Sequence, residues 1–591
     1  MLNRRTARSA SSNISDTETG NTTSSSLTEP NDNNSSSPTN NNNTNPTATT
    51  TTTHQQQQPR QQPKQTVKKK RKKSSSWKHY LPLCFVFTYV VVVMMALALL
   101  VRYLWNPSSK NKDGGGSSTA IISQFQAQQH DANRLKVGET SLDGTDPAHL
   151  EYPKILRPNN DDSTKPFYYY KYPILSQAAL DMCTRTLWHT IETTTIVLPN
   201  KETFVHTGDI DDLWLRDSAA QVHPLLVPLF GPNRTQSLIA TDAKLDRIVS
   251  GLIRRTATYI RHDPYANAFR IDDSYVFSQA QKRMGRHDLI STWNYELDSL
   301  AFWMRMVYFY AKQSPNGMRP ESVVRLEKVQ QAAEIMVDLW KAEQQHELDD
   351  VSVPRGPLFD CLNCNKPYRY PGLPRNGKGS PTNASAGLTW TGFRPSDDEC
   401  KYGYLIPANM FAIVALEYVQ DMATKIWKNS ELAIKAHRLA QEIQLGIETH
   451  GIVTHPVHGK IYAYEVDGLG NSFVMDDANI PSLLSIPYLG YKHYDRQVYA
   501  NTRRFILSHD NPYYHKGTND ITGEIEGYGS PHMERAIRNN IWPMSIAMQG
   551  LTSDDVEEKV RLVETLVKAS AGTGWMHESF DVANPRHFTR S

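Results

Sequence analysis

Apolar residues recur at helical spacing through the C-terminal part of the sequence. Between Leu245 and Ile253 they occupy positions i, i+3, i+4, i+7 and i+8, which places one apolar face on an amphipathic helix. The same spacing returns in four more segments, 323–340, 411–427, 432–447 and 556–567. Ser553-Asp-Asp precedes the last segment and supplies a cap and first-turn acids. Segments that alternate apolar and polar residues are few, so the pattern predicts an all-α fold.

These helices belong to one long predicted domain, residues 146–591. The sequence shows no heptads and no repeat of 20–50 residues. Many helices without heptads favour a helical toroid or solenoid over a bundle. The domain also has no glycine-rich phosphate loop and no nucleophile elbow, which argues against nucleotide-dependent enzymes and α/β hydrolases.

The residues before this domain fall into three segments of different composition. Residues 1–79 are mostly Ser, Thr, Asn, Gln and Pro, which bury too little apolar area to fold, so they predict a disordered tail. Residues 80–104 open with a stretch of 22 uncharged residues (80 to 101), long enough for a helix to cross about 30 Å of hydrocarbon. Residues 105–145 are rich in Gly, Ser and Gln and predict a flexible stem.

The charge of the chain is concentrated in the tail. Residues 1–79 carry 12 Lys and Arg against four acids, so the tail is +8, the whole chain is +3 and the remainder is −5. A mildly acidic domain lacks the clustered cations that a nucleic-acid partner requires. The basic run Lys68–Lys73 lies just before the apolar segment and keeps the N-terminus cytoplasmic by the positive-inside rule. We therefore expect a single-pass type II membrane protein of the Golgi or another secretory-pathway membrane, with a lumenal domain.

Cysteines and glycosylation sequons agree with a lumenal domain. The cysteines of the domain are Cys183, Cys361, Cys364 and Cys400. Their even number is compatible with disulfides, and free thiols are the alternative. Asn233-Arg-Thr and Asn383-Ala-Ser are acceptor sites for glycans if they face the lumen. No second Cys/His pair accompanies Cys361-Leu-Asn-Cys364, so we expect no metal there.

Loops between the predicted helices combine Trp, Tyr, Asp, Glu, Arg and His. They lie at 207–221, 390–404, 464–468, 475–479, 529–532 and 575–580. Aromatic faces stack on sugar rings, and carboxylates and Arg bind hydroxyl groups, so this mixture is typical of a carbohydrate site. Glycoside hydrolysis needs one protonated and one ionised carboxyl group. The adjacent Asp397 and Asp398 fit that need, since like charges raise one of two neighbouring pKa values.

Each of these residues also has a structural interpretation. An Asp-Asp doublet before a helix is often a cap. Arg216 followed by Asp217 is equally consistent with a buried ion pair. Histidines such as His532 and His577 are more often hydrogen-bonded structural residues than catalysts. Composition alone leaves both interpretations open.

Eight strings occur in order between residues 170 and 590. They are Gly-Asp-Ile-x-x-x-Trp-Leu-Arg-Asp-Ser-x-Ala-Gln-Val (208–222), Asp-Pro-Tyr-Ala-Asn-Ala-Phe (263–269), Tyr-Glu-Leu-Asp-Ser-Leu (295–300), Gly-Phe-Arg-Pro-Ser-Asp-Asp (392–398), Tyr-Leu-Ile-Pro-Ala-Asn-Met-Phe (404–411), Met-Asp-Asp-Ala-Asn (475–479), Gly-Ser-Pro-His (529–532) and Met-His-Glu-Ser-Phe (576–580). The succession resembles glycoside hydrolase family 125, whose members are exo-acting α-1,6-mannosidases.

The resemblance implies an (α/α)6 barrel, an inverting mechanism, and no metal or other cofactor. It implies that the general acid is Asp397 or Asp398, with Asp398 favoured, and that the general base is Glu578. In an inverting enzyme the two carboxyl groups stand about 6.5–9.5 Å apart. The candidates for holding the terminal mannose are Trp214, Arg216, Asp217, Tyr402, His532 and His577.

The sequence departs from the family pattern at two places. Family chains continue past Phe-Thr-Arg with an aromatic helical segment, whereas this sequence stops at Ser591, so we expect a closing helix of the barrel to be missing. After His532, the stretch 533–540 replaces a shorter one, so we expect a reshaped loop near the site.

Three function classes remain in competition. The main hypothesis is a membrane-anchored exo-α-1,6-mannosidase that acts on mannose-containing glycans. The alternative is a lectin-like helical barrel that binds mannosides without cleaving them. A glycosyltransferase would also carry a type II anchor, and Asp209-Ile-Asp211 has the spacing of its metal site. The predicted helical domain argues against the α/β sheet that a glycosyltransferase needs.

Overall fold

A computed structural model describes residues 175–228, 237–348, 367–534 and 536–590. All of them fall within one unit of the chain, residues 77–591. The predicted tail, apolar segment and stem, residues 1–145, lie outside the described residues and stay predictions. Within the described ranges, no helix combines the length and apolarity needed to cross a membrane.

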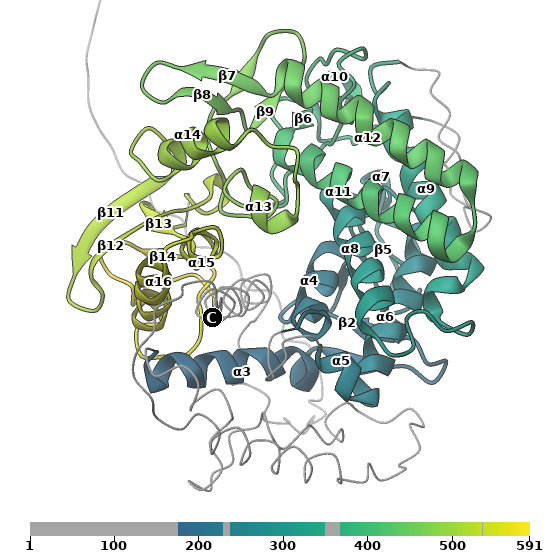
Figure 1. Cartoon of the computed structure of the whole chain (residues 1–591), viewed down its shortest axis with the longest axis horizontal. Helices are drawn as coiled ribbons and strands as arrows, with labels where there is room; N and C mark the ends of the chain where they lie inside the picture. Colours follow the sequence, from purple (N-terminus) through teal and green to yellow (C-terminus); the bar gives the residue numbers. More distant parts are fainter. Residues whose placement is uncertain (1–174, 229–236, 349–366, 535, 591) are drawn as a thin grey trace, which may run out of the picture. The chain divides into compact units, whose positions relative to one another are not determined.

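The described residues form two layers of helices (Figure 1). Helices buried around most of their circumference form the inner layer: α4 (Leu215–Leu226), α8 (Leu297–Gln313), α11 (Ile406–Met422) and α15 (Pro543–Leu551). Helices that bury one face form the outer layer: α3 (Gln177–Thr193), α6 (Ala243–His262), α9 (Glu327–Glu343), α12 (Ser430–His450), α14 (Arg496–Ile506) and α16 (Val556–Ala569). Short helices connect them: α5 (Leu238–Thr241), α7 (Gln279–Arg283), α10 (Pro374–Gly377) and α13 (Ile486–Leu489).

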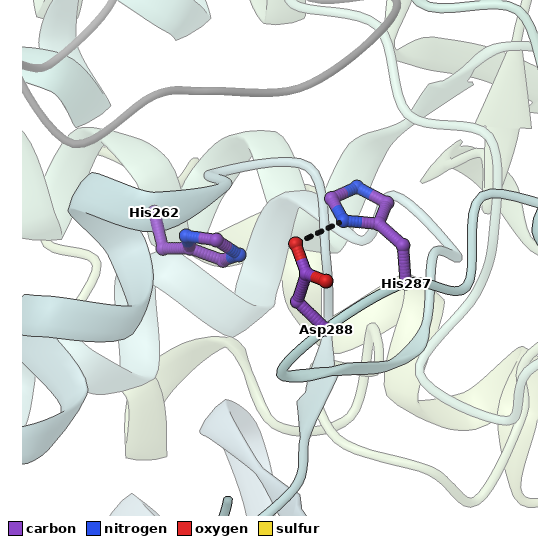
Figure 2. Close-up of side chains that lie close together, drawn as sticks. All are labelled: His262, His287 and Asp288. Carbon is purple, nitrogen blue, oxygen red and sulfur yellow. Dashed lines mark hydrogen bonds and ion pairs between the residues drawn. The ribbon is translucent and has the colours of Figure 1, made fainter. Parts of the chain in front are cut away.

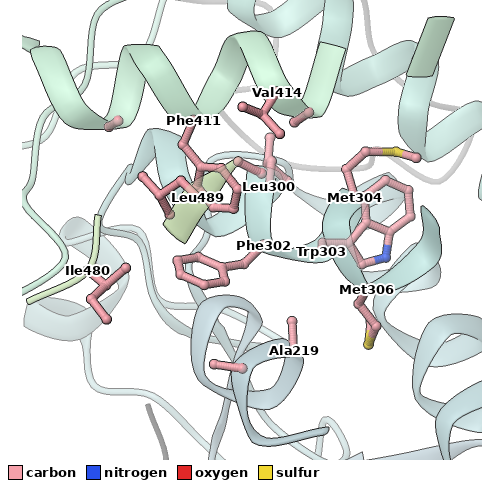
Figure 3. Packing of buried hydrophobic residues seen from close by; sticks show 14 of the residues in the cluster. Ala219, Leu300, Phe302, Trp303, Met304, Met306, Phe411, Val414, Ile480 and Leu489 are labelled. Carbon is pink, nitrogen blue, oxygen red and sulfur yellow. The ribbon is translucent and has the colours of Figure 1, made fainter. Parts of the chain in front are cut away.

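Neighbouring inner helices pack on one another, and so do neighbouring outer helices. Helix α8 contacts both α4 and α11, while α9 contacts both α6 and α12. Inside the core, Phe302 of α8 meets Phe411 of α11 edge to face, with ring centroids 4.9 Å apart. Figure 3 shows these rings beside Trp303 and Val414. Each fully buried side chain of this size contributes about 1.5–3 kcal/mol, so the contact between α8 and α11 is a main source of stability.

All five helices predicted from periodicity are confirmed. Residues 245–253 lie in α6, 432–447 in α12 and 556–567 in α16. Segment 411–427 spans α11 and its π-helical extension η4 (Ala423–Trp427). Segment 323–340 is split into the 3₁₀ turn η3 (Val323–Arg325) and α9, because Leu326 takes an extended conformation. The predicted cap of α16 is wrong by two residues: Asp555 accepts the N–H of Glu557 at the N-cap position.

The prediction of an all-α fold is incomplete, because the described residues also contain short antiparallel strands. Four pairs are β1 (Thr195–Val197) with β2 (Thr203–Val205), β7 (Ile452–His455) with β8 (Gly459–Tyr462), β11 (Tyr514–Asn519) with β12 (Gly523–Tyr528), and β13 (Asn540–Ile541) with β14 (Phe580–Asp581). Two three-stranded sheets are β3 (Leu213–Trp214), β4 (Ala268–Phe269) and β5 (Ile290–Thr292), and β10 (Ser472–Phe473), β9 (Glu465–Val466) and β6 (Tyr404–Leu405). Apart from β7, β8, β11 and β12, these strands have only two or three residues, too few to show a period of two in the sequence.

The described cysteines do not form a disulfide. Cys183 is buried and Cys400 is half-buried, and both are free thiols. Cys361 and Cys364 lie outside the described residues. The free-thiol alternative therefore holds for the two cysteines that the structure describes.

Candidate active site

Three of the eight motif strings, 208–222, 295–300 and 404–411, run into the N-terminal ends of inner helices. Strand β3 runs directly into α4, β6 runs directly into α11, and β5 and β13 lie just before α8 and α15. A helix N-terminus presents unpaired N–H groups and the positive end of the helix dipole, which favours carboxylates. Acidic side chains occupy these first turns, Asp217 in α4 and Asp298 in α8.

Arg216 is the centre of a buried charge cluster. Its guanidinium forms ion pairs with Asp217 at 2.5 Å, with Glu296 at 3.4 Å and with Asp298 at 3.4 Å. All four residues are buried. The sequence alternative of a buried Arg216–Asp217 ion pair is therefore confirmed. Three carboxyl groups from the starts of two helices share a single guanidinium.

This excess of carboxyl groups keeps protons inside the cluster. Burial raises the pKa of Glu296 well above its ordinary value, although Arg216 opposes it. Burial, again opposed by Arg216, raises the pKa of Asp298 to about 7. Burial also opposes the charge of Arg216, but the facing carboxylates, Asp217 first among them, raise its pKa above the usual range. The guanidinium therefore stays charged while the carboxyl groups share protons.

Asn267 connects this cluster to Asp397. The side-chain amide of Asn267 donates to Glu296 Oε1 at 3.0 Å and to Asp397 Oδ1 at 3.3 Å. Asn294 Nδ2 donates to the same Asp397 oxygen at 3.5 Å. The Thr292 hydroxyl donates to Asn267 Oδ1 at 2.6 Å, which fixes the orientation of the amide. The sheet of β3, β4 and β5 thus holds Asp397 through two amides.

Asp398 lies in the same turn as Asp397 but contacts a different residue, His532. Its Oδ1 lies 3.2 Å from His532 Nδ1, and its Oδ2 accepts the Ser396 hydroxyl at 3.0 Å. The side chains of Asp398 and His532 are 32% and 36% exposed, so solvent reaches both. Burial would raise the pKa of Asp398, but the hydrogen bond and charge of His532, together with the Ser396 hydroxyl and the charge of Arg394, lower that pKa below its ordinary value. The same hydrogen bond raises the pKa of His532, so the pair retains a proton near neutral pH.

Glu578 approaches His532 from the C-terminal segment. The Glu578 N–H donates to the Arg590 carbonyl at 3.0 Å, and the Glu578 carboxyl lies 3.7 Å from Arg590 Nε. Burial raises the pKa of Glu578, and the charges of Arg590 and then His532 oppose that rise. Arg590 also pairs with Asp209 at 3.7 Å. His532 is therefore a common electrostatic neighbour of Asp398 and Glu578.

Glu465 brings Tyr402 to the same turn. This buried carboxylate of β9 accepts Arg394 Nε at 2.5 Å and the Tyr402 N–H at 2.7 Å. Arg394 begins the turn, since its N–H donates to the Asp398 carbonyl at 2.8 Å and its own carbonyl accepts the Asp397 N–H at 3.0 Å. The Arg394–Glu465 ion pair therefore sets the position of both adjacent acids.

Two predicted sugar contacts, Trp214 and His577, are buried among protein groups. The Nε2 of His577 lies 3.1 Å from the Ser570 carbonyl, and its ring stacks on Phe588 with centroids 3.6 Å apart. These contacts hold the backbone next to Glu578. Trp214 is the buried N-cap residue of α4. A sugar contact stays a prediction for both.

The structure adds polar residues that sequence reasoning did not select. Glu296, Asp298, Asn267, Asn294 and Glu465 all contact selected residues, as described above. Most of them lie inside the motif strings 263–269 and 295–300 or next to them, so these strings could have identified them as candidates. Their roles depend on which carboxylates meet Arg216 in space, and a linear motif does not report that.

Comparisons with known proteins agree with this geometry. Residues 176–591 match the family of metal-independent α-mannosidases, glycoside hydrolase family 125. The chain is 38% identical over 413 residues to the meiotically up-regulated gene 157 protein of Schizosaccharomyces pombe, covering 68% of this chain and 75% of that protein. It also resembles a solved metal-independent α-mannosidase of Streptococcus pneumoniae in a non-productive complex with α-1,6-mannobiose. That similarity has a TM-score of 0.60 and 36% identity, over 72% of this chain and 91% of the other.

Proposed function

Because the chain belongs to glycoside hydrolase family 125, the metal-independent α-mannosidases, we propose that it is an exo-acting α-1,6-mannosidase. It would release terminal mannose from glycans with inversion at the anomeric carbon. The α-1,6-mannobiose bound to the Streptococcus pneumoniae relative supports this linkage. The two helix layers would then belong to an (α/α)6 barrel, the fold that the motif resemblance implies.

One relationship carries the proposal: Asp398 and Glu578 both act on His532, from segments 180 positions apart in sequence (578 − 398). An inverting glycosidase needs a proton donor on one side of the glycosidic bond and a carboxylate that activates water on the other. We assign the donor to Asp398, because its side chain is open to solvent and bonded to a proton-carrying histidine. We assign the water-activating base to Glu578.

Asp397 has a supporting role in this proposal. Both amide donors, from Asn267 and Asn294, bind its Oδ1, and Glu296 is also hydrogen-bonded to its carboxyl group. Asp397 would therefore hold the turn against the Arg216 cluster while Asp398 faces the substrate. Among the candidates for mannose contact, Tyr402 is half-buried and His532 is exposed, so both remain available to a ligand.

The decisive assay is hydrolysis of α-1,6-mannobiose by the purified chain, with the released anomer followed by NMR. We expect β-mannose as the first product, because inversion converts the α linkage to the β anomer. Glu578→Gln should lose this activity, and Glu431→Gln, at an exposed position in the first turn of α12, is the control. Tight mannoside binding without turnover in the unmodified chain would support the lectin-like alternative instead.

We further propose that the enzyme is a single-pass type II protein of the Golgi or another secretory-pathway membrane. The support is the apolar segment 80–104 with its basic flank Lys68–Lys73. Protease digestion of intact microsomes separates the two topologies. An N-terminal tag should be digested and a C-terminal tag protected, and the reverse result would overturn this orientation.

A further inference from the structure

Three potential metal ligands converge at the C-terminal end of α6, outside the carboxylate site. They are His262, the last residue of α6, and His287 and Asp288 in the loop before β5. One donor atom from each lies within 4.8 Å of the other two. Figure 2 shows the Asp288 carboxylate between the two imidazole rings.

The donor atoms are arranged for a shared ion. His287 Nδ1 and Asp288 Oδ2 are 3.3 Å apart. Tetrahedral zinc with ligand bonds of about 2.0–2.1 Å has ligand atoms roughly 3.3 Å from one another, so this pair already has the spacing of one tetrahedral edge. No two of these donor atoms are more than 4.8 Å apart, so bringing them to that spacing requires at most about 1.5 Å, a movement within reach of side-chain rotation.

His262 supplies an independent observation. Its Nε2 is buried and has no hydrogen-bond partner among the described residues. A buried polar nitrogen without a partner costs free energy, so such atoms usually have a role. In Figure 2 the far ring nitrogen of His262 faces the Asp288 carboxylate. An ion bound between them would satisfy this nitrogen.

The surrounding structure holds the two segments in place before any ion binds. Trp293 Nε1 donates to Asp263 Oδ2 at 3.1 Å, and Asp263 is the neighbour of His262. The Arg270 N–H donates to the Leu289 carbonyl at 2.7 Å. The residue after α6 is therefore tied to the residue after β5, and the loop before β5 is tied to the residue after β4, which lowers the entropic cost of gathering the ligands.

We propose that His262, His287 and Asp288 bind one zinc-class divalent ion, with water completing the coordination. Two imidazoles and a carboxylate are donors that zinc accepts, and Ca²⁺ and Mg²⁺ prefer oxygen alone. The ion would link α6 to the loop that leads into β5, and among the described residues the hydrogen bonds of its three ligands do not include Asp398 or Glu578. Its effect is on stability, and the glycosidic chemistry does not pass through it.

A second cluster, His455, His458 and Asp510, has comparable spacing but a different hydrogen-bond pattern. His455 Nδ1 accepts the N–H groups of Val457 at 3.2 Å and His458 at 3.3 Å. Such acceptance places the proton of the neutral ring on Nε2, which then cannot ligate. This cluster is therefore a matched control for the first.

The test is titration of the full-length, chelator-treated chain with zinc chloride, followed by calorimetry and thermal unfolding. We expect one ion per chain and a rise in the unfolding midpoint with zinc concentration. His262→Gln and His287→Gln should each weaken binding by about tenfold or more, since even outer-shell changes cost 10–100-fold in affinity. Asp288→Asn is the further variant if either histidine substitution impairs folding.

The control variant is His458→Gln, which should bind zinc like the unmodified chain. Absence of a saturable site in the unmodified chain would overturn the proposal. So would loss of binding in His458→Gln with full binding in His262→Gln and His287→Gln. Mannobiose hydrolysis does not enter these readouts, so failure of the zinc proposal and failure of the proposed function are distinguishable.

Discussion

His532 Nδ1 lies 3.2 Å from Asp398 Oδ1, and this contact joins the loop after β12 to the turn that carries both candidate acids. The hydrogen bond lowers the pKa of Asp398 and raises that of His532. A proton therefore stays in the pair up to a pH above the ordinary histidine value of 6.5. If Asp398 is the general acid, this shared proton is the one that reaches the leaving group.

The first prediction concerns the basic side of the pH–rate profile. Activity should fall as the pH rises through the pKa of the Asp398–His532 pair, because the shared proton is lost there. His532→Gln removes the histidine that retains this proton, so the basic limb of kcat/KM should move to lower pH. His493→Gln is the control, because that exposed histidine contacts Glu417 instead. An unmoved limb in His532→Gln would contradict the pairing.

The second prediction concerns the acid side. Burial raises the pKa of Glu578, and a base must be ionised, so activity should rise with pH through a value above 4.5. Arg590 opposes this rise in pKa, so Arg590→Gln should move the acid limb to higher pH. Arg586→Gln, at an exposed ion pair with Asp520, should leave it unchanged. Equal shifts in both variants would rule out a specific Arg590–Glu578 effect.

The third prediction separates the two adjacent acids. Removing a general acid should slow mannobiose hydrolysis by about 10²–10⁴-fold. The loss should be much smaller for an aryl α-mannoside with a good leaving group, which needs no proton. Asp398→Asn should show this difference. Asp397→Asn should slow both substrates alike, because Asp397 holds the turn through Asn267 and Asn294. If Asp397→Asn showed the difference between substrates and Asp398→Asn did not, Asp397 would be the general acid.

The fourth prediction concerns the stability of the Arg216 cluster. Arg216→Met leaves Asp217, Glu296 and Asp298 buried without their cation. Removing one partner of a buried ion pair costs about 3–5 kcal/mol of unfolding free energy. Urea unfolding should show this loss for Arg216→Met, whereas the exposed Arg586→Met should change stability by only about 0.5 kcal/mol. An equally small loss of unfolding free energy for Arg216→Met would mean that the carboxyl groups of Asp217, Glu296 and Asp298 are protonated, and therefore uncharged, in the folded protein.

Burial explains only part of which helices sequence reasoning found, because it found the buried α11 and missed α3 and α14, which expose one face. Helix α6 exposes one face, so its apolar positions recur at a period that the sequence displays. Helices α4, α8 and α15 are buried on nearly all sides, and a helix that is buried all round has no apolar stripe to detect. The amphipathic outer layer was therefore easier to predict than much of the inner layer that carries the site.

The candidate site was predictable only in part, for a related reason. Asp397, Asp398, Glu578 and His532 lie in motif strings that resemblance could identify. Asp217 could be paired with Arg216 from sequence, but Glu296 could not, because it lies 80 positions away and meets Arg216 only when α4 and α8 pack. Burial sets the direction of the pKa shifts at Glu296 and Glu578, and burial follows from the fold.

The last prediction concerns Asp298 and the pH dependence of stability. Burial raises the folded-state pKa of Asp298 to about 7, above its ordinary value of 3.8. The folded protein therefore binds this proton more tightly than the unfolded chain does, and stability should fall as the pH rises from about 4 to about 7. Asp298→Asn keeps the shape of the neutral carboxyl group but cannot ionise, so this part of the pH dependence should disappear.

Urea unfolding of both proteins between pH 4 and 8 measures that difference. The unmodified chain should lose on the order of a few kcal/mol relative to Asp298→Asn across this range, with most of the change complete near pH 7. Asp520→Asn, at an exposed ion pair, should follow the unmodified chain. Parallel curves for the unmodified chain and Asp298→Asn would show that Asp298 is already ionised beside Arg216 at low pH. The proton shared by the cluster would then have to reside on Glu296, whose pKa is raised as well.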